Sequence, residues 1–225
     1  MCTTEASARG LFITFEGPDG SGKSTQMRLL AARLRNAGHD VLESTEPGGT
    51  PIGMQIRRIL LDPANDELCP TAELLLMFAA RAQNVEQWIL PALKAGRIVL
   101  SDRFTDSSLV YQGAGRGLGA NVVRQIDRIA CHGLEPCLTL CIDIDVAKGL
   151  ARAHARNRNV EPAQQESRLD EQALDFHQKA RAAYLQLAAA EPGRIKLIDG
   201  DAAPDIVAER VWRHIEPVLR SAPIA

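Results

Sequence analysis

A glycine-rich stretch near the start of the chain, FEGPDGSGKST at residues 15–25, combines residue types that bind phosphate. It matches the spacing G-x-x-x-x-G-K-[ST] through Gly17, Gly22, Lys23 and Ser24. Glycines let a backbone approach an anion closely, and the N–H groups of such a loop converge on phosphate oxygens. The pattern predicts a nucleoside triphosphate ligand, with Lys23 at the β- and γ-phosphates and the Ser24 hydroxyl at Mg²⁺. The alternative is a tight turn with only a structural role.

The segments on either side of this loop favour phosphate binding over a structural turn. The apolar run LFITF before it is typical of a buried strand, and the helical pattern STQMRLLAARLRNAG follows it. A helix N-terminus attracts negative charge through its dipole and its free N–H groups. We expect a helix over residues 24–37, with Leu29, Leu30 and Leu34 on its inner face. The residues expected to hold ATP are Gly17, Asp19, Gly20, Ser21, Gly22, Lys23, Ser24 and Thr25.

Two charged residues at the end of a later apolar run could also act on phosphate. In RIVLSDRF, Asp102 and Arg103 come directly after the apolar residues. Asp102 is placed like a second Mg²⁺ contact, made directly or through water, although a turn or helix-capping aspartate is the alternative. The Arg103 guanidinium could pair with phosphate through two parallel hydrogen bonds.

A run of cations at residues 147–158, AKGLARAHARNR, could close over a bound nucleotide. It contains Lys148, Arg152, Arg156 and Arg158, with His154 between two of the arginines. As a mobile flap, these cations would neutralise charge during phosphoryl transfer and exclude water. The alternative is a solvated basic helix face. The chain lacks the N-K-x-D sequence that reads guanine in many GTPases, which favours a kinase over a switch.

Composition limits the other possibilities. The 225 residues suit one domain, and 26 basic against 28 acidic residues provide no field for wrapping a nucleic acid. The five cysteines show neither a C-x-x-C pair nor a zinc spacing, and no apolar run is long enough to cross a membrane. We therefore expect a cytoplasmic protein with a flexible tail at residues 1–10, a domain over residues 11–219 and a second tail at residues 220–225.

Short β-like runs alternate with helical patterns, which predicts an α/β fold. The runs expected to be strands are residues 11–16, 41–44, 97–101, 138–143 and 194–198. Because several of them are almost entirely apolar, they are typical of parallel strands covered on both faces by helices. A longer helix is expected over residues 71–95, with Pro91 ending or bending it. Ligands of such sheets bind beyond the carboxyl ends of the strands, where the glycine loop lies.

Several motifs in order resemble those of one family, the bacterial thymidylate kinases, which are P-loop nucleoside monophosphate kinases. Beside the phosphate loop, they are TEPGGTPIG, LLLMFAARAQNVEQWILPAL, SDRFTDSSLVYQGAGRGLG and ESRLDEQALDFHQKARAAYLQLA. The resemblance covers residues 11–218. It implies a three-layer P-loop kinase fold with a five-stranded parallel sheet, a short lid near residues 148–167, and transfer of the γ-phosphoryl group of ATP to dTMP with Mg²⁺. It also implies a homodimer, in which a helix over residues 74–93 buries its outer face; packing within one chain is the alternative use of the same residues.

The resemblance further implies roles for individual residues. Asp19 accepts from the 3′-hydroxyl of dTMP, Arg81 donates to a thymine carbonyl, and Tyr111 crowds the sugar 2′ position. An Asx turn, a surface ion pair and core packing are the respective alternatives. The implied dTMP site comprises Asp19, Arg57, Phe78, Arg81, Arg103, Ser108, Tyr111 and Gln112. The implied catalytic residues are Lys23, Arg103, Arg152 and Arg156, the metal contacts are Ser24 and Asp102, and residues 199–202 lie along adenine.

The chain departs from the family pattern at several positions. Gly20 stands where one branch carries a catalytic arginine, so this chain resembles the branch that draws its arginines from the lid. His154 replaces the middle arginine of an R-A-R-A-R run, and its charge depends on pH. The thymine-stacking phenylalanine aligns with Met77, and Phe78 beside it could rotate into the site instead. The rival functions are a kinase for another nucleoside or monophosphate, and a nucleotide-binding switch without transferase activity.

Overall fold

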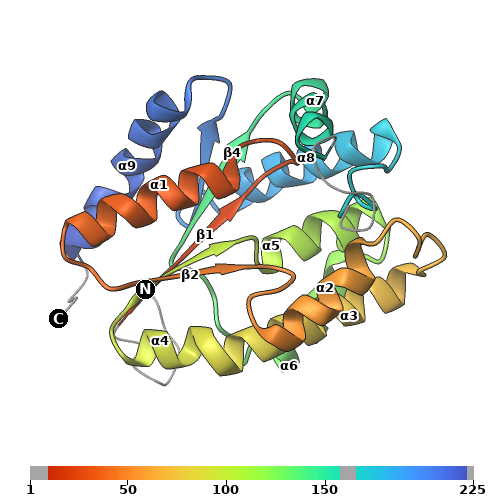
Figure 1. Ribbon diagram of the computed structural model, residues 1–225, viewed down its shortest axis with the longest axis horizontal. Helices are drawn as coiled ribbons and strands as arrows, with labels where there is room; N and C mark the ends of the chain where they lie inside the picture. The colour runs from red at the N-terminus through yellow and green to blue at the C-terminus, as the bar shows by residue number, and fades with distance from the viewer. Residues whose placement is uncertain (1–9, 158–165, 222–225) are drawn as a thin grey trace.

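The computed structural model describes residues 10–157 and 166–221, with the side chains of Arg156 and Asn157 excluded. Five parallel strands form one sheet in the order β2-β3-β1-β4-β5 (Figure 1). They are β1 (Leu11–Glu16), β2 (Val41–Thr45), β3 (Ile98–Asp102), β4 (Leu138–Asp143) and β5 (Ile195–Asp199). The predicted α/β class and all five parallel strands are confirmed, with ends displaced by one residue in β2, β3 and β5.

Helices α1 (Lys23–Asn36) and α9 (Pro204–Ser221) pack together on one face of the sheet (Figure 1). Ile13 and Phe15 of β1 point to this face and share its apolar core with Leu34. Leu30 and Leu34 are buried as predicted, but the prediction for Leu29 was wrong because its side chain is 42% exposed. Neighbouring residues of a helix are turned by about 100°, so Leu29 and Leu30 cannot both face the sheet squarely.

The opposite face is covered by a second group of helices. It comprises α3 (Pro70–Asn84), η1 (Val85–Ile89), α4 (Leu90–Lys94), η2 (Leu109–Gly115), α6 (Ala120–Ala130) and α8 (Leu174–Ala190). Phe12 of β1 and Val99 of β3 point to this side, which follows from the alternation of side chains along a strand. The sheet is therefore the middle of three layers.

The predicted long helix continues past Pro91. The helical path continues from α3 through the π-helical segment η1 into α4, and Pro91 lies in the first turn of α4. Proline lacks an N–H group, and the wider turn of a π-helix is one way for a helix to absorb such a residue. The segments α3, η1 and α4 therefore follow one another without a break on one face of the sheet.

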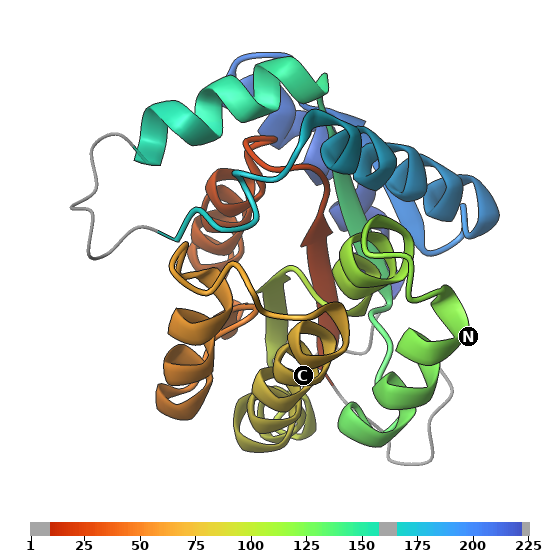
Figure 2. The ribbon, with the colours of Figure 1, turned by 90° about the vertical axis from the view of Figure 1, so that its right-hand side faces the viewer.

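Three further helices surround the carboxyl ends of the strands. They are α2 (Pro51–Leu61), whose N-cap Thr50 accepts from the backbone N–H of Gly53, the single-turn α5 (Thr105–Ser108), and α7 (Val146–Asn157). Figure 2 shows α2 and α7 on either side of this end of the sheet. In the described residues, no helix is long and apolar enough to cross a membrane.

The edges of the predicted domain differ slightly from the structure. Gly10, assigned to a tail, donates its N–H to the carbonyl of Leu93, and α9 continues to Ser221. Residues 1–9, 158–165 and 222–225 lie outside the described residues, and with them most of both predicted tails and part of the predicted lid.

Candidate active site

The phosphate-binding loop connects β1 to α1 at the carboxyl edge of the sheet. Register places Phe15 of β1 opposite Asp102 of β3, so the loop and the end of β3 lie side by side. Lys23 opens α1 and donates through Nζ to the carbonyls of Gly17 (3.0 Å) and Pro18 (2.8 Å). Burial, followed by the charge of Arg103, lowers the pKa of Lys23 to about 8. The Lys23 ammonium group therefore lies over the loop and is bound to two of its carbonyls.

The other residues predicted for ATP also belong to this loop and the first turn of α1. Gly22 caps the helix in the left-handed region at φ 98°, and Ser21 is buried within the loop. Ser24 and Thr25 are exposed at the helix start, where hydroxyls and free N–H groups face outward. These positions fit an anion site at a helix N-terminus.

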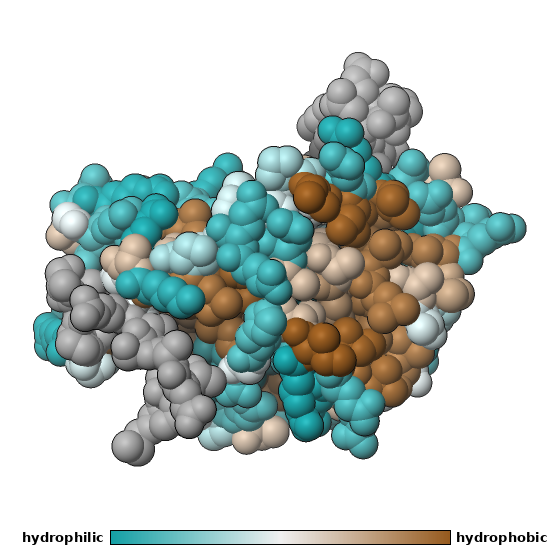
Figure 3. Space-filling view, turned by 90° about the horizontal axis from the view of Figure 1, so that it is seen from below, coloured by the Kyte–Doolittle hydropathy of each residue, from teal (hydrophilic) through white to brown (hydrophobic). Residues whose placement is uncertain are grey.

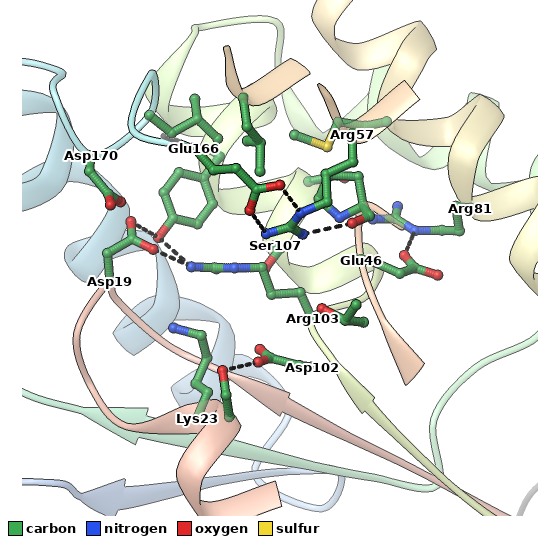
Figure 4. Close-up of a pocket in the computed structure, with 18 of the residues that line it drawn as sticks. Asp19, Lys23, Glu46, Arg57, Arg81, Asp102, Arg103, Ser107, Glu166 and Asp170 are labelled. Atoms are coloured by element: carbon green, nitrogen blue, oxygen red, sulfur yellow. Dashed lines mark hydrogen bonds and ion pairs between the residues drawn. The ribbon is translucent and has the colours of Figure 1, made fainter. Parts of the chain in front are cut away.

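Ser24 and Asp102 have the chemistry required of the predicted metal contacts. The Ser24 hydroxyl donates a hydrogen bond to Asp102 Oδ2 (Figure 4). Two oxygen atoms of the kind that Mg²⁺ prefers as ligands therefore lie next to each other at the start of α1. Among the described residues, no group of three or more His, Cys, Asp or Glu side chains could hold a metal by itself. Mg²⁺ commonly takes only one or two protein ligands and completes its shell with phosphates and water. The pair therefore fits a Mg²⁺ that arrives with a nucleotide.

A cavity of about 380 Å³ opens beside the loop and brings together most of the predicted acceptor residues. Asp19, Arg57, Arg81, Arg103, Ser108, Tyr111 and Gln112 all line it. This volume is within the range of small-molecule sites. Figure 4 shows side chains from the loop, α2, α3 and the end of β3 directed into the same space.

Asp19 and Arg103 form the charged floor of this cavity. The Arg103 Nη2 contacts Asp19 Oδ1, and the Tyr111 hydroxyl donates to Asp19 Oδ2 at 2.9 Å. Burial alone would raise the pKa of Asp19, but Arg103 and Lys23 outweigh it, so the pKa lies below its ordinary value. Arg103 has φ 73°, which is uncommon for a residue with a side chain. The ionised pair lies between the phosphate loop and the deeper part of the cavity.

Arg81 lies at the deep end of the cavity and is 2% exposed. Its Nε donates to Glu46 Oε2 and its Nη2 to the carbonyl of Phe104, whereas Nη1 has no hydrogen-bond partner among the described residues. Asn84 donates to the second oxygen of Glu46 at 3.1 Å, which fixes the carboxylate. A buried, unpartnered donor is costly in free energy, so Nη1 is suited to a ligand oxygen.

Met77, and not Phe78, contributes to the lining of the cavity. Phe78 is 2% exposed and belongs to the apolar core, with the Arg81 guanidinium 4.5 Å from its ring centre. The expectation that Phe78 turns into the site is therefore not met. The two positions are neighbours on α3, so only one of them can face the cavity.

Arg57 of α2 pairs with Glu166, the first residue of the ESRLDEQ motif, for which the sequence predicted no role. Its Nε and Nη2 donate to the two carboxylate oxygens at 2.8 and 2.6 Å, and Nη1 donates to the carbonyl of Pro47 at 2.8 Å (Figure 4). A carboxylate bound in this forked manner presents the same geometry as two oxygens of a phosphate. The contact shows that this face of Arg57 can hold an oxyanion inside the cavity.

Gln112 takes part in a buried network that sequence patterns did not reveal. Glu73, fully buried on α3, accepts from Gln112 Nε2 (2.8 Å), from Arg116 Nη2 (3.0 Å) and from Arg168 Nη2 (2.8 Å). A glutamate in the first turn of a helix usually faces solvent, and nothing in the local pattern signals its burial. The network ties Gln112 to the segment that follows the predicted lid.

Comparison with known proteins identifies the family. The thymidylate kinase family model matches residues 15–211. The thymidylate kinase of Solidesulfovibrio magneticus is 48% identical over 209 residues, covering 93% of this chain and all of that protein. The thymidylate kinase of Deinococcus radiodurans is 47% identical over 208 residues, covering 92% and 97%. This chain belongs to the thymidylate kinase family.

A solved structure agrees with this assignment. The crystal structure of thymidylate kinase from Ehrlichia chaffeensis superposes with a TM-score of 0.73 at 29% identity, covering 92% of this chain and 98% of that one. The expected three-layer P-loop kinase fold is confirmed.

The cations expected to serve this family's lid begin on α7. Lys148 pairs with Asp201 at 2.5 Å, and Arg152 Nη2 lies 4.0 Å from the other oxygen of Asp201. Arg152 is therefore directed toward the loop after β5, which the sequence placed along adenine. The Arg156 side chain and all of Arg158 lie outside the described residues.

Close packing explains why the loop carries Gly20 where one branch of the family has arginine. A Cβ at Gly20 would lie 1.9 Å from the carbonyl oxygen of Gly149 on α7, and a Cβ at Gly149 would lie 2.4 Å from that of Asp19. Two backbones thus touch where α7 begins. A loop arginine is sterically excluded from this arrangement, so any further cation has to come from another segment.

The variant Gly149→Ala tests this contact. Alanine normally stabilises a helix by roughly 1 kcal/mol relative to glycine. Here the added methyl group would push α7 off the phosphate loop, so we expect a loss of about 1–3 kcal/mol in the free energy of unfolding. The measurement is urea unfolding.

Gly193→Ala is the matched control, because its Cβ would meet no atom within 4 Å. The contact would be disproved if Gly149→Ala were as stable as the control.

Proposed function

We propose that this protein transfers the γ-phosphoryl group of ATP to dTMP and releases ADP and dTDP. The observation that carries the proposal is the cavity floor, where Lys23, Asp19 and Arg103 meet between a phosphate loop and a nucleotide-sized cavity. Family membership supports it, since the relatives of highest listed similarity are named thymidylate kinases over nearly their full length. Direct in-line transfer requires such a meeting point, because donor and acceptor phosphates must face each other.

The donor side rests on the loop. Its N–H groups and Lys23 hold the phosphates of ATP. Ser24, and Asp102 directly or through water, would hold Mg²⁺, which would supply positive charge to the phosphates. Lys23 is protonated below a pKa of about 8, so its charge is present near neutral pH. The segment at residues 199–202 lies along adenine.

The acceptor side rests on the cavity. Arg57 and Arg103 hold the monophosphate of dTMP, and Asp19 accepts from the 3′-hydroxyl. For Arg57 to bind phosphate, the Glu166 carboxylate has to leave its forked contact. No general base is needed if the dTMP phosphate arrives as a dianion, so positioning and charge stabilisation carry the reaction.

Base recognition follows from the unpartnered donor of Arg81. Nη1 donates to a thymine carbonyl, and Glu46 holds the rest of the guanidinium in place. Ser108 and Gln112 provide polar contacts to the base, Met77 packs on it, and the Tyr111 ring disfavours ribose. Cytosine carries an amino group where thymine and uracil carry this carbonyl. Two donors, the amino group and Arg81 Nη1, would then face each other, which favours thymine and uracil over cytosine.

A substrate panel tests the activity. With ATP and Mg²⁺, we expect ADP formation that depends on dTMP, weaker turnover with dUMP, and little with UMP or dGMP, measured in a coupled assay. Preference for another monophosphate would favour the rival kinase. Tight nucleotide binding without any dTMP-dependent ADP would favour a switch.

The lid arginines of the proposal are tested by Arg152→Ala and Arg156→Ala. Each removes one cation that would stabilise the moving phosphoryl group, so we expect kcat to fall by about 10- to 100-fold with a smaller change in KM. Arg220→Ala, which removes an exposed arginine that pairs with Glu216 far from the cavity, is the control. Unimpaired rates in both lid variants would remove the lid from the mechanism.

We also propose that the protein is a cytoplasmic homodimer. Seen from below, hydrophobic side chains gather on the right of one face, the side on which α2 and α3 lie in Figure 1 (Figure 3). Exposed apolar residues of this region include Ile52 and Ile59 on α2, Leu75 on α3 and Ile129 on α6. Contiguous apolar surface of this kind marks an interface more often than a free surface. Leu74 and Leu93, the ends of the range expected to serve a dimer, are buried within the chain.

The variant Leu75→Glu tests the dimer. The wild-type chain should sediment at about twice 24.4 kDa. A charge in a buried interface is unfavourable, so the variant should sediment as a monomer. Ile206→Glu, at an equally exposed position on α9, should stay dimeric. A monomeric wild-type chain would refute the proposal.

A further inference from the structure

Glu16 is a buried carboxylate to which the site described above gives no role. It is the last residue of β1, directly before the phosphate loop, and it is 0% exposed. In the part of the chain that the structure describes, it forms no ion pair, and it does not line the cavity. Burying a carboxylate is costly in free energy, so its place at the centre of the site calls for a physical reason.

Four donors converge on this carboxylate. Two are backbone N–H groups at the start of α5, those of Phe104 (2.7 Å) and Ser107 (3.3 Å). The other two are hydroxyls, Ser107 Oγ at 2.6 Å and Tyr184 Oη at 2.8 Å. Tyr184 belongs to α8, so the carboxylate joins three elements that are distant in the sequence.

The same two hydroxyls accept from Arg103. Its Nη1 lies 3.0 Å from Ser107 Oγ and 3.2 Å from Tyr184 Oη. A hydroxyl that donates to Glu16 turns its lone pairs toward the guanidinium, and the two hydroxyls also lie 2.9 Å from each other. The carboxylate thus acts on Arg103 through two polarised hydroxyls, while Asp19 holds Nη2 on the other side.

Glu16 also holds the backbone of Arg103 in its uncommon conformation. Arg103 has φ 73°, and the next N–H, that of Phe104, donates to Glu16 at 2.7 Å. A non-glycine residue in the left-handed region costs free energy and persists only where its surroundings fix it. The carboxylate therefore helps to fix this turn, together with the hydrogen bonds from Ser101 Oγ to the Arg103 carbonyl and from the Arg103 N–H to the Phe15 carbonyl.

We infer that Glu16 is a positioning residue for phosphoryl transfer, which aims the Arg103 guanidinium at the reacting phosphates through Ser107 and Tyr184. The inference rests on the proposed function, in which Arg103 binds the acceptor phosphate and the moving phosphoryl group. Glu16 itself would contact neither ATP nor dTMP.

The protonation state of Glu16 offers a readout. Burial, followed by the charge of Asp106, raises the pKa of Glu16 to about 7. The ionised form alone accepts from all four donors, so aiming of Arg103 should weaken as pH falls through 7. Other titratable or charged groups face this region: Lys23 on α1, Asp106 on α5 with its partner Arg194, Cys141 on β4 and Tyr184 on α8.

The experiment compares Glu16→Gln with Thr14→Val. Thr14 is equally buried on β1 and pairs with Thr139 through its hydroxyl, away from the cavity. We expect Glu16→Gln to lower kcat/KM for dTMP by about 10- to 100-fold and to leave the KM for ATP within about twofold. In the wild type, the fall of kcat/KM for dTMP toward acid pH should contain a component near pH 7, and Glu16→Gln should lack this component. Thr14→Val should match the wild type in kcat/KM for dTMP and in the KM for ATP.

Tyr184→Phe keeps the test open if Glu16→Gln does not fold. It retains the carboxylate and removes one of the two linking hydroxyls, so kcat/KM for dTMP should fall by about 3- to 10-fold. In the variant that carries both Glu16→Gln and Tyr184→Phe, kcat/KM for dTMP should fall by less than the product of the two single effects. Both substitutions act on the same guanidinium, that of Arg103.

Wild-type kcat/KM for dTMP in Glu16→Gln, or in Tyr184→Phe where the first does not fold, would overturn the inference. Failure of the wild-type chain to make dTDP would overturn the proposed function instead, since that result involves no variant.

Discussion

The contact between Arg103 and Asp19 is the interaction on which the rest of the site depends. It joins the end of β3 to the phosphate loop after β1, and both ions are largely buried. A buried ion pair is stable only when hydrogen bonds satisfy its remaining atoms. Tyr111 supplies one to Asp19, and Ser107 and Tyr184 accept from Arg103. The pair therefore draws η2, α5 and α8 toward the loop and sets the shape of the cavity.

Carboxylates hold the other cations of the site as well. Glu46 binds Arg81, Glu166 binds Arg57, and Asp201 binds Lys148. These ion pairs differ in solvent exposure, and therefore in how firmly they fix the cation. The Arg81 pair is deeply buried and fixes one orientation, whereas the Lys148 pair is exposed to water and contributes little to stability. The deep end of the cavity, around Arg81, is thus held in one arrangement, and the exposed contacts of α7 can exchange at small cost.

Much of the fold and part of the site could be predicted because the signals are local. The loop motif, the five apolar strands and the Asp102–Arg103 pair each occupy a few consecutive residues. Errors arose where neighbouring residues compete for one direction. Leu29 faces solvent beside buried Leu30, and Phe78 enters the core beside Met77. Sequence periodicity cannot separate adjacent positions of a helix when both are apolar, because packing against other elements decides the rotation.

The sequence by itself determined that a phosphate loop precedes a helix, that parallel strands place it at the ligand edge of a sheet, and that the motifs are those of the thymidylate kinases. Only the tertiary structure decided which charges meet. Glu16, Glu46, Glu73 and Glu166 lie far along the chain from their partners, and no spacing rule connects them. The physical reason is that burial makes a charge depend on every neighbour within a few ångströms, and those neighbours are chosen by the packing of whole elements.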